Sequence, residues 1–279
     1  NVEQMKEDSI SDHNISRVFQ ETIETIVNES EIIKIKNEVD HLNKRQEILN
    51  LDKYSNLTSE DTVIVIQVHN RLENLKYLVE SLTNVKHINK SLVIFSHDYW
   101  DDEINHFVRS ISAFKVMQIF FPFSVQLNPF SYPGKEPRGC KEDKLNETRE
   151  NCQNVHRKFR DPLKFQIKHH WWWKLVQIFD KLRDLSRFEG NVLFLEEDHY
   201  VFPDILHLLK LFVRERNKSY PSVNVFNLAN HNLQFPSNSN RAQKGSWLIH
   251  KSNFGFAFNR TVYNMIKSCQ EKFFRNPPS

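Results

Sequence analysis

The spacing of hydrophobic positions along the chain changes near residue 60. Over residues 1–59, apolar residues recur mostly at helical spacing among charged ones, with no glycine or proline. This pattern predicts a charged, helical, stem-like segment that could pack on the rest of the protein. Residues 55–61 (SNLTSED) have the composition of a linker. We therefore expect the main domain to span residues 60–279.

From Thr62 onward, short apolar runs of strand type alternate with longer runs whose apolar residues share one helical face. The expected strands are 62–68, 91–98, 116–125, 191–201, 223–229 and part of 246–258, and the expected helices are 71–82, 162–182, 203–213 and 260–269. Repeats of this kind favour parallel strands joined by right-handed crossovers. The predicted fold class is therefore α/β. A long polar loop, 128–161, interrupts the repeat, and such a loop is often functional or tied by a disulfide.

Composition excludes several classes of function. A net charge of +3 from 38 basic and 35 acidic residues implies no basic face, so we expect no nucleic-acid partner. Only five glycines occur, and no GxGxxG or Walker-type loop is present, so any phosphate must be held by other means. No apolar run approaches the roughly 18 residues that a membrane span requires.

Asparagine sequons and cysteines bear on the compartment. N-x-S/T occurs seven times, where composition alone would give roughly three. This supports a location in the lumen of the secretory pathway. The competing explanation is that the extra sequons arose by chance in an Asn-rich sequence. Cys140 and Cys152 flank a polar loop and Cys269 is left over, which fits an oxidising compartment without proving it.

Polar clusters follow three of the expected strands: residues 67–71, 96–98 and 196–199. The carboxyl ends of parallel strands meet at one edge of an open sheet, where ligands bind. The last cluster ends the stretch VLFLEEDHY with three successive acids. Alternation along a strand would direct Glu196 and Asp198 to one side, and Glu197 and His199 to the other.

Adjacent carboxylates resist burial unless a cation neutralises them. A hard divalent ion such as Mg²⁺ or Mn²⁺ would bind one or two of these oxygens together with substrate phosphates. One carboxylate usually suffices as the direct ligand. The alternative is a solvated acidic turn leading into a helix whose N-terminus Asp204 favours.

The stretch KHHWWWKL, residues 168–175, lies in an expected helix and directs its side chains around nearly the whole circumference. A helix that is apolar on all sides is buried on all sides, so we expect the tryptophans to be core residues. Lys168, His169 and His170 are better candidates for contacts with a nucleotide pyrophosphate.

Two further candidates have structural alternatives. Asn70 and Arg71 open a helix whose N-terminus could bind an anion or a ribose, although Arg71 could equally be an exposed residue paired with nearby acids. Asp98 could hydrogen-bond a uracil or ribose, or it could cap the next helix.

Five motifs together resemble a known family. QVHNR (67–71), VIFSHD (93–98), FFPFS (120–124), KHHWWWKL and LFLEEDHY (193–200) occur in an order and at separations that closely resemble the GlcNAc-transferase II family, the Golgi α-1,6-mannosyl-glycoprotein 2-β-N-acetylglucosaminyltransferases. The resemblance covers about residues 62–269. It implies a GT-A-type, Rossmann-like fold that binds UDP-GlcNAc and Mn²⁺ and transfers GlcNAc, with inversion, to the 2-hydroxyl of the α-1,6-linked mannose of an N-glycan on a glycoprotein.

The resemblance also assigns roles to residues. The nucleotide would be held by Gln67, Val68, His69, Asn70, Arg71, Asp98, Gln166, Ile167, Lys168, His169 and His170. Asp198 would ligate the metal, with Glu196 and Glu197 in support. Cys140 and Cys152 match a disulfide pair of the family. The implied location is the lumenal side of the Golgi membrane, with anchoring only through a segment that is not in this chain.

Departures from the family lie at three places. Leu72 stands where the family usually has proline, and Ile167 replaces a polar residue, so we expect no side-chain hydrogen bond from position 167. The family continues past the helix of Cys269 into a segment with the proposed base, a second metal-ligating histidine and more cysteines, whereas this chain ends QEKFFRNPPS. We therefore expect the catalytic base to lie beyond Ser279, and the GT-A fold of this chain to be incomplete at its C-terminus. The alternative to a transferase is a truncated, non-catalytic UDP-GlcNAc-binding or inactive remnant.

Overall fold

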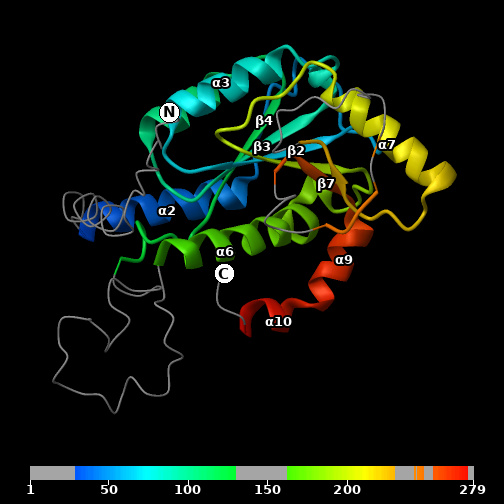
Figure 1. The fold of residues 1–279 in the computed structure, drawn as a ribbon. Coiled ribbons are helices and arrows are strands. Elements are labelled where there is room, and N and C mark those ends of the chain that lie inside the picture. Colours follow the sequence, from blue (N-terminus) through cyan, green and yellow to red (C-terminus); the bar gives the residue numbers. More distant parts are fainter. Residues whose placement is uncertain (1–28, 130–161, 230–241, 243, 248–253, 276–279) are drawn as a thin grey trace, which may run out of the picture.

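The computed structural model of the protein describes residues 29–129, 162–229, 242, 244–247 and 254–275 (Figure 1). Within these residues, strands form one mixed sheet in the order β1-β4-β3-β2-β5-β7-β6. The strands are β1 (Ile48–Leu49), β2 (Val63–Val68), β3 (Leu92–His97), β4 (Lys115–Phe120), β5 (Val192–Glu196), β6 (Phe226–Asn227) and β7 (Phe256–Phe258). The four central strands β4, β3, β2 and β5 are parallel, and the outer strands are antiparallel to their neighbours. The predicted α/β class is confirmed.

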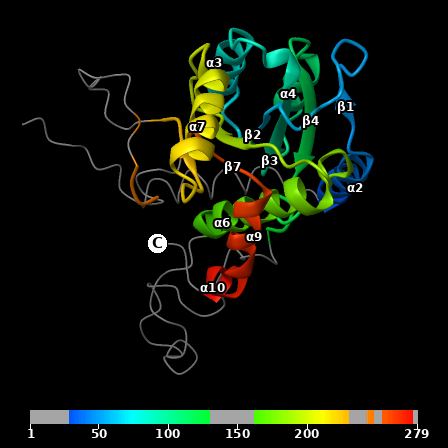
Figure 2. The same ribbon diagram turned by 90° about the vertical axis from the view of Figure 1, so that its right-hand side faces the viewer.

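Helices cover both faces of this sheet, as the two ribbon views show (Figures 1 and 2). They are α2 (Glu29–Arg45), α3 (Leu72–Thr83), α4 (Asp102–Ser110), α6 (Pro162–Val176), α7 (Ile205–Ser219), α9 (Arg260–Ser268) and α10 (Gln270–Arg275), with short turns η1 (Ile88–Lys90), η2 (Gln177–Lys181) and η3 (Arg183–Leu185). Ile64 and Ile66 of β2 pack with α3, α4 and α7, whereas Val63 and Val65 pack with α6, η2 and α9. Successive strand residues point to opposite faces, so a continuous apolar run is what a sheet covered on both sides requires.

The order in which strands are added to the sheet reverses at β2. β3 and β4 lie on one side of β2, whereas β5 lies on the other. The register aligns Gln67 with Ser96 of β3 and with Glu196 of β5. In open α/β sheets, ligands bind beyond the carboxyl ends of the strands at such a reversal. The three polar clusters therefore meet at one edge.

Some elements end earlier than the apolar pattern predicts. β4 ends at Phe120 although apolar residues continue beyond it, because Pro122 has no N–H to donate to a ladder. β5 ends at Glu196, and a turn begins at Glu197. Gly255, just before β7, has φ +61°, a conformation that favours glycine. Its carbonyl accepts a hydrogen bond from Leu228 N–H at 2.7 Å.

The described part of the predicted stem packs on the sheet. Val39 of α2 contacts the cluster of Phe120 and Leu127, and the Asn43 amide bonds both the N–H and the carbonyl of Phe120 at 2.8 and 2.7 Å. β1 then pairs with β4 as an outermost strand of the sheet. The helix predicted in this segment is confirmed by α2, while its role as a stem and the boundary at residue 59 stay predictions.

Other predictions fall on residues that are not described. Residues 130–161 of the long loop, and with them the Cys140–Cys152 pairing, lie outside the described residues. Ser279 lies outside them as well, and the expectation that the catalytic base follows it stays a prediction. Cys269 is an exposed free cysteine. No helix in the described ranges combines the length and the apolar character needed to cross a membrane.

Lys115, the first residue of β4, is a buried anchor between separate segments. Its side chain is 1% exposed. Nζ donates to the carbonyls of Ser55 at 2.9 Å and Lys90 at 3.0 Å. The charged donor thus holds residues of the predicted linker against the turn before β3.

Replacing Lys115 with methionine should lower the free energy of unfolding by about 1–3 kcal/mol, because buried carbonyls lose a charged hydrogen-bond donor. Urea denaturation monitored by circular dichroism measures this change. Lys76→Met is the control, since its partner Glu73 is exposed and such a surface pair contributes about 0–1 kcal/mol. Equal losses in the two variants would contradict the anchoring role.

Candidate functional site

The carboxyl edge of the sheet brings together the residues that follow β2, β3 and β5. The N–H of Asp98 donates to the carbonyl of Val68 at 3.1 Å, and the N–H of Glu197 donates to the carbonyl of Gln67 at 3.0 Å. These backbone bonds fix three chain segments side by side just beyond the strands. The convergence predicted from parallel pairing is confirmed.

Asp98 is buried between two imidazole rings at the carboxyl ends of the strands. Its Oδ1 is 2.6 Å from His69 Nδ1. Its Oδ2 is 3.3 Å from His170 Nδ1, out of hydrogen-bond alignment, and the other ring nitrogen of His170 is 2.7 Å from Ser96 Oγ. Asp101, not Asp98, caps α4 by accepting from Ile104 N–H, so the capping alternative for Asp98 is wrong.

The two histidines also set the charge of Asp98. Burial raises the pKa of Asp98, but its contacts with His170 and His69 outweigh burial and hold the pKa well below its usual value. Burial lowers the pKa of His69, but the hydrogen bond to Asp98 and the charges of Asp98 and Glu197 raise it above 6.5 overall. The site therefore holds the ionised Asp98 carboxylate, hydrogen-bonded to the His69 ring, which is protonated more readily than a free imidazole.

Arg71 is the cation that meets two of the three successive acids. Its Nε donates to Glu197 Oε1 at 2.6 Å and its Nη1 donates to Asp198 Oδ2 at 2.9 Å. Glu197 is 1% exposed, and its second oxygen accepts from His69 N–H at 2.7 Å. Both oxygens of Glu197 are thus engaged by the protein. The pairing of Arg71 with nearby acids, one of the two alternatives from the sequence, is what the structure shows.

Lys174 is the cation beside the remaining acid, Glu196. Burial lowers the pKa of Lys174 to about 8, opposed by the charges of Glu196 and Asp98. Burial likewise raises the pKa of Glu196, opposed by Lys174. Lys174 was not among the residues predicted from the sequence. It lies four residues after His170, and this helical spacing puts both on one face, which was the available signal.

A metal ion could be held by the turn after β5. Ligand atoms of Glu196, Asp198 and His199 lie within 4.8 Å of one another. The strand alternation expected through residue 199 is wrong, because the strand ends at Glu196 and the turn brings His199 to the side of Glu196 and Asp198. His199 Nδ1 accepts the N–H of Glu196 at 3.2 Å, so the neutral ring carries its proton on Nε2 and offers no free lone pair. The two carboxylates are therefore the better ligands in this conformation.

The candidate residues of α6 have different surroundings. Only His170, which is fully buried, reaches the carboxylate cluster. Gln166 is buried and accepts the N–H of Val125 at 2.6 Å, while Ile167 is 52% exposed. Lys168 lies 4.6 Å from the ring of Phe273. The ring of His169 is next to those of Phe165 and Phe274.

The prediction that the tryptophans of α6 are core residues is confirmed in full only for Trp172. Trp172 is buried, and Trp171 and Trp173 are partly buried against the core. Of the remaining candidates, Val68 is buried and Asn70 is exposed. The structure thus gathers Gln67, His69, Arg71, Asp98 and His170 around the acids. Asn70 lies in the same turn as His69 and Arg71, with an exposed side chain.

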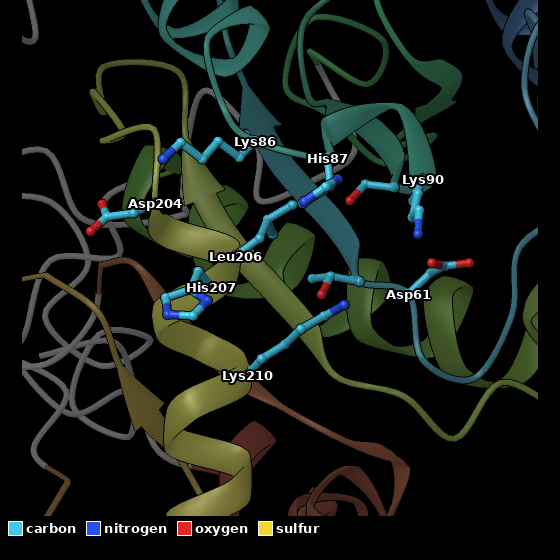
Figure 3. A pocket seen from close by; sticks show the side chains of 10 residues that line it. Asp61, Lys86, His87, Lys90, Asp204, Leu206, His207 and Lys210 are labelled. Carbon is cyan, nitrogen blue, oxygen red and sulfur yellow. The ribbon is translucent and has the colours of Figure 1, made fainter.

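A cavity of about 400 Å³ lies at the opposite edge of the sheet (Figure 3). Thr62 and Ser91, which precede β2 and β3, line it together with residues of η1 and the start of α7. Its labelled side chains carry both signs of charge, including Lys86 and Lys210 but also Asp61 and Asp204 (Figure 3). The cavity is at the amino ends of the strands, and ligands of open α/β sheets bind at the carboxyl ends.

These features define a class of protein. A Rossmann-like sheet with a carboxylate cluster at its reversal point is the arrangement expected of a GT-A-type glycosyltransferase fold. The chain belongs to the N-acetylglucosaminyltransferase II (MGAT2) family, whose model matches residues 36–276.

Similar proteins agree with this assignment. The chain is 36% identical over 250 residues to the α-1,6-mannosyl-glycoprotein 2-β-N-acetylglucosaminyltransferase of Sus scrofa, covering 86% of this chain and 56% of that protein. It is 33% identical over 229 residues to the protein of the same name from Arabidopsis thaliana, covering 80% and 52%. The chain thus spans about half the length of these relatives.

A solved structure, S. aureus TarS 1–349 in complex with UDP-GlcNAc, matches at a TM-score of 0.38 and 11% identity over 74% of this chain and 47% of that one. A likeness at this level carries no structural argument.

The His69–Asp98 pair should make stability depend on pH. Because the folded-state pKa of His69 is raised, its contribution is complete below about pH 6.5, the unfolded value, and is lost as pH rises through the folded value. His69→Gln should cost about 1–2 kcal/mol at pH 6, and the cost should shrink by pH 9. Urea unfolding in EDTA, without nucleotide, measures both. The control is the exposed His207→Gln, and a pH-independent difference for His69→Gln would contradict the pairing.

Proposed function

We propose that the protein of this chain is a metal-dependent, inverting β-1,2-N-acetylglucosaminyltransferase. It transfers GlcNAc from UDP-GlcNAc to the 2-hydroxyl of the α-1,6-linked mannose of N-glycans on glycoproteins, in the biosynthesis of complex N-glycans. The observation that carries the proposal is the cluster of Glu196 and Asp198 with Arg71, at the sheet's reversal point, in a chain of the N-acetylglucosaminyltransferase II family. The proposed location is the lumenal side of the Golgi membrane.

Side chains at the reversal point are proposed to hold the donor nucleotide. Arg71 lies half exposed at the start of α3, where a guanidinium and free helix N–H groups favour phosphate. Asp98, kept ionised by its two histidines, can accept a hydrogen bond from the nucleoside. Gln67 and His170 complete the cluster. Val68, Asn70 and residues 166–169 keep their predicted nucleotide-binding roles only as proposals from the family resemblance.

Asp198 is proposed as the direct ligand of Mn²⁺. Its side chain is 37% exposed and Arg71 contacts only one of its oxygens. Glu196 lies within reach of the same point. Hard carboxylate oxygens suit a hard divalent ion, so these residues fit the group. Neutralisation of the charge that develops on the departing UDP is the chemistry that such an ion supplies. Glu197, with both oxygens engaged, is proposed only to orient Arg71.

The acceptor half of the reaction requires a carboxylate base to take the proton of the mannose hydroxyl. None of the described carboxylates is assigned to that role, because each acid of the cluster faces Arg71, Lys174 or a histidine. We keep the prediction from the family resemblance that this base follows Ser279 in the whole protein. Inversion in a single displacement requires the base on the face of the sugar opposite to UDP. The cluster described above is therefore proposed to serve donor binding.

A transfer assay tests the proposed function. The whole protein, including the segment proposed to carry the base, is incubated with UDP-GlcNAc, Mn²⁺ and an N-glycan whose α-1,6-linked mannose has a free 2-hydroxyl. Mass spectrometry should show a product heavier by one GlcNAc, and linkage analysis should place it on the 2-position. Binding of UDP without any product would favour the non-catalytic alternative. Absence of both would overturn the proposal.

Asp198→Asn should weaken the affinity for UDP in the presence of Mn²⁺ by at least about tenfold, because the variant lacks the anionic metal ligand. Isothermal titration calorimetry measures UDP binding with Mn²⁺ and with EDTA, and the loss should vanish in EDTA. Glu215→Gln, an exposed acid of α7, is the matched control and should bind as the wild type does. Unchanged Mn²⁺-dependent affinity in Asp198→Asn would refute the ligand assignment.

A further inference from the structure

Lys174 is a buried lysine whose ammonium group reaches the end of β2. The residue is 2% exposed, and Nζ donates to Gln67 Oε1 at 2.8 Å. Burying an ammonium group is costly unless it is paired and hydrogen-bonded. An apolar side chain of similar length would fill the same space at no such cost. Packing alone therefore does not account for a lysine here.

The charges around Lys174 place it between the two halves of the carboxylate cluster. Glu196 and Asp98 are the acids whose charges act on it. Glu196 stands opposite Gln67 in the register of β2 and β5. The ammonium group is thus held at the end of β2 by Gln67, within range of the charges of Glu196 and Asp98.

The contact with Lys174 determines which end of the Gln67 amide is available to a ligand. An ammonium group can only donate, so it requires the amide oxygen to face it. The amide –NH₂ is then left as a pure donor, on a side chain that is partly exposed. A nucleotide offers base carbonyl, ribose and phosphate oxygens, all of which accept hydrogen bonds. Without Lys174 the amide can turn over and present its oxygen, which repels these acceptors.

We propose that Lys174 is a positioning residue of the nucleotide site. It acts through Gln67, whose amide it holds with the –NH₂ group directed to UDP, and does not touch the ligand. This inference rests on the proposed function, since it requires that UDP binds at this edge of the sheet. It adds a residue to the site that lies behind the ligand-contacting side chains.

A double-mutant cycle tests this role. Calorimetry with UDP and Mn²⁺ is carried out on the wild type, Lys174→Met, Gln67→Met and the double variant. Each single substitution should weaken UDP binding by about tenfold. The double variant should bind no more than about twofold more weakly than Gln67→Met, because the two residues act in series. Lys164→Met, an exposed lysine of the same helix, is the control and should leave the affinity unchanged.

The outcomes separate positioning from a structural role. If Lys174→Met lowers the melting temperature but binds UDP like the wild type, Lys174 serves only the fold and the inference is overturned. Fully additive losses of affinity would overturn it as well, because Lys174 would then act independently of Gln67.

Gln67→Glu tests the same idea without removing the lysine. This variant keeps an oxygen facing Lys174 but replaces the –NH₂ donor with a negatively charged oxygen, so it should bind UDP at least as weakly as Gln67→Met. Wild-type affinity in Gln67→Glu overturns the inference, whether or not Lys174→Met folds. Failure of the wild type to bind UDP would instead overturn the proposed function and this inference together.

Discussion

Neutralising four carboxylates at one edge of the sheet is the constraint on which the rest of this structure depends. Asp98, Glu196 at the end of β5, and Glu197 and Asp198 in the turn after it meet there, because parallel strands direct their carboxyl ends to the same side. Groups from two other segments oppose their charge. His69 and Arg71 come from the end of β2 and the start of α3, and His170 and Lys174 come from α6. Removing any of these segments would leave buried negative charge unopposed.

The same constraint divides the acids into roles. Glu197 is fully engaged by Arg71 and by the N–H of His69, and it ties the turn after β5 to the start of α3. Asp198 is the most accessible of the three acids, because the turn lifts it out of the strand. Glu196 is less exposed than Asp198 and less buried than Glu197, and it lies beside Lys174. Three identical charges in sequence thus become a structural tie, an accessible carboxylate and a partly buried one.

Local pattern was enough to predict most of the elements and their meeting point, but not β1 or α10. The strand starts and the helices after β2 and β5 follow from apolar runs and periodicity, since burial on both faces leaves a continuous apolar signature. The convergence of Gln67, Asp98 and Glu196 followed from parallel pairing alone. Side-chain directions beyond the strand ends were less accessible, because the alternation rule holds only inside a strand. His199 was placed on the wrong side for this reason, and the position of Asp101 rather than Asp98 at the start of α4 needed backbone geometry.

The sequence by itself determined the α/β class, the edge of the sheet that carries the site, and the family to which the motifs point, because these depend on periodicity and on motifs that are local in the chain. Only the tertiary structure decided which cation meets which acid. Arg71 and Glu197 are 126 residues apart, and Lys174 and Gln67 are 107 apart. Such pairs form only once the crossover helices have packed. Hydrogen-bond geometry over a few ångströms then fixed the amide of Gln67 and the tautomer of His199, which no spacing in the sequence encodes.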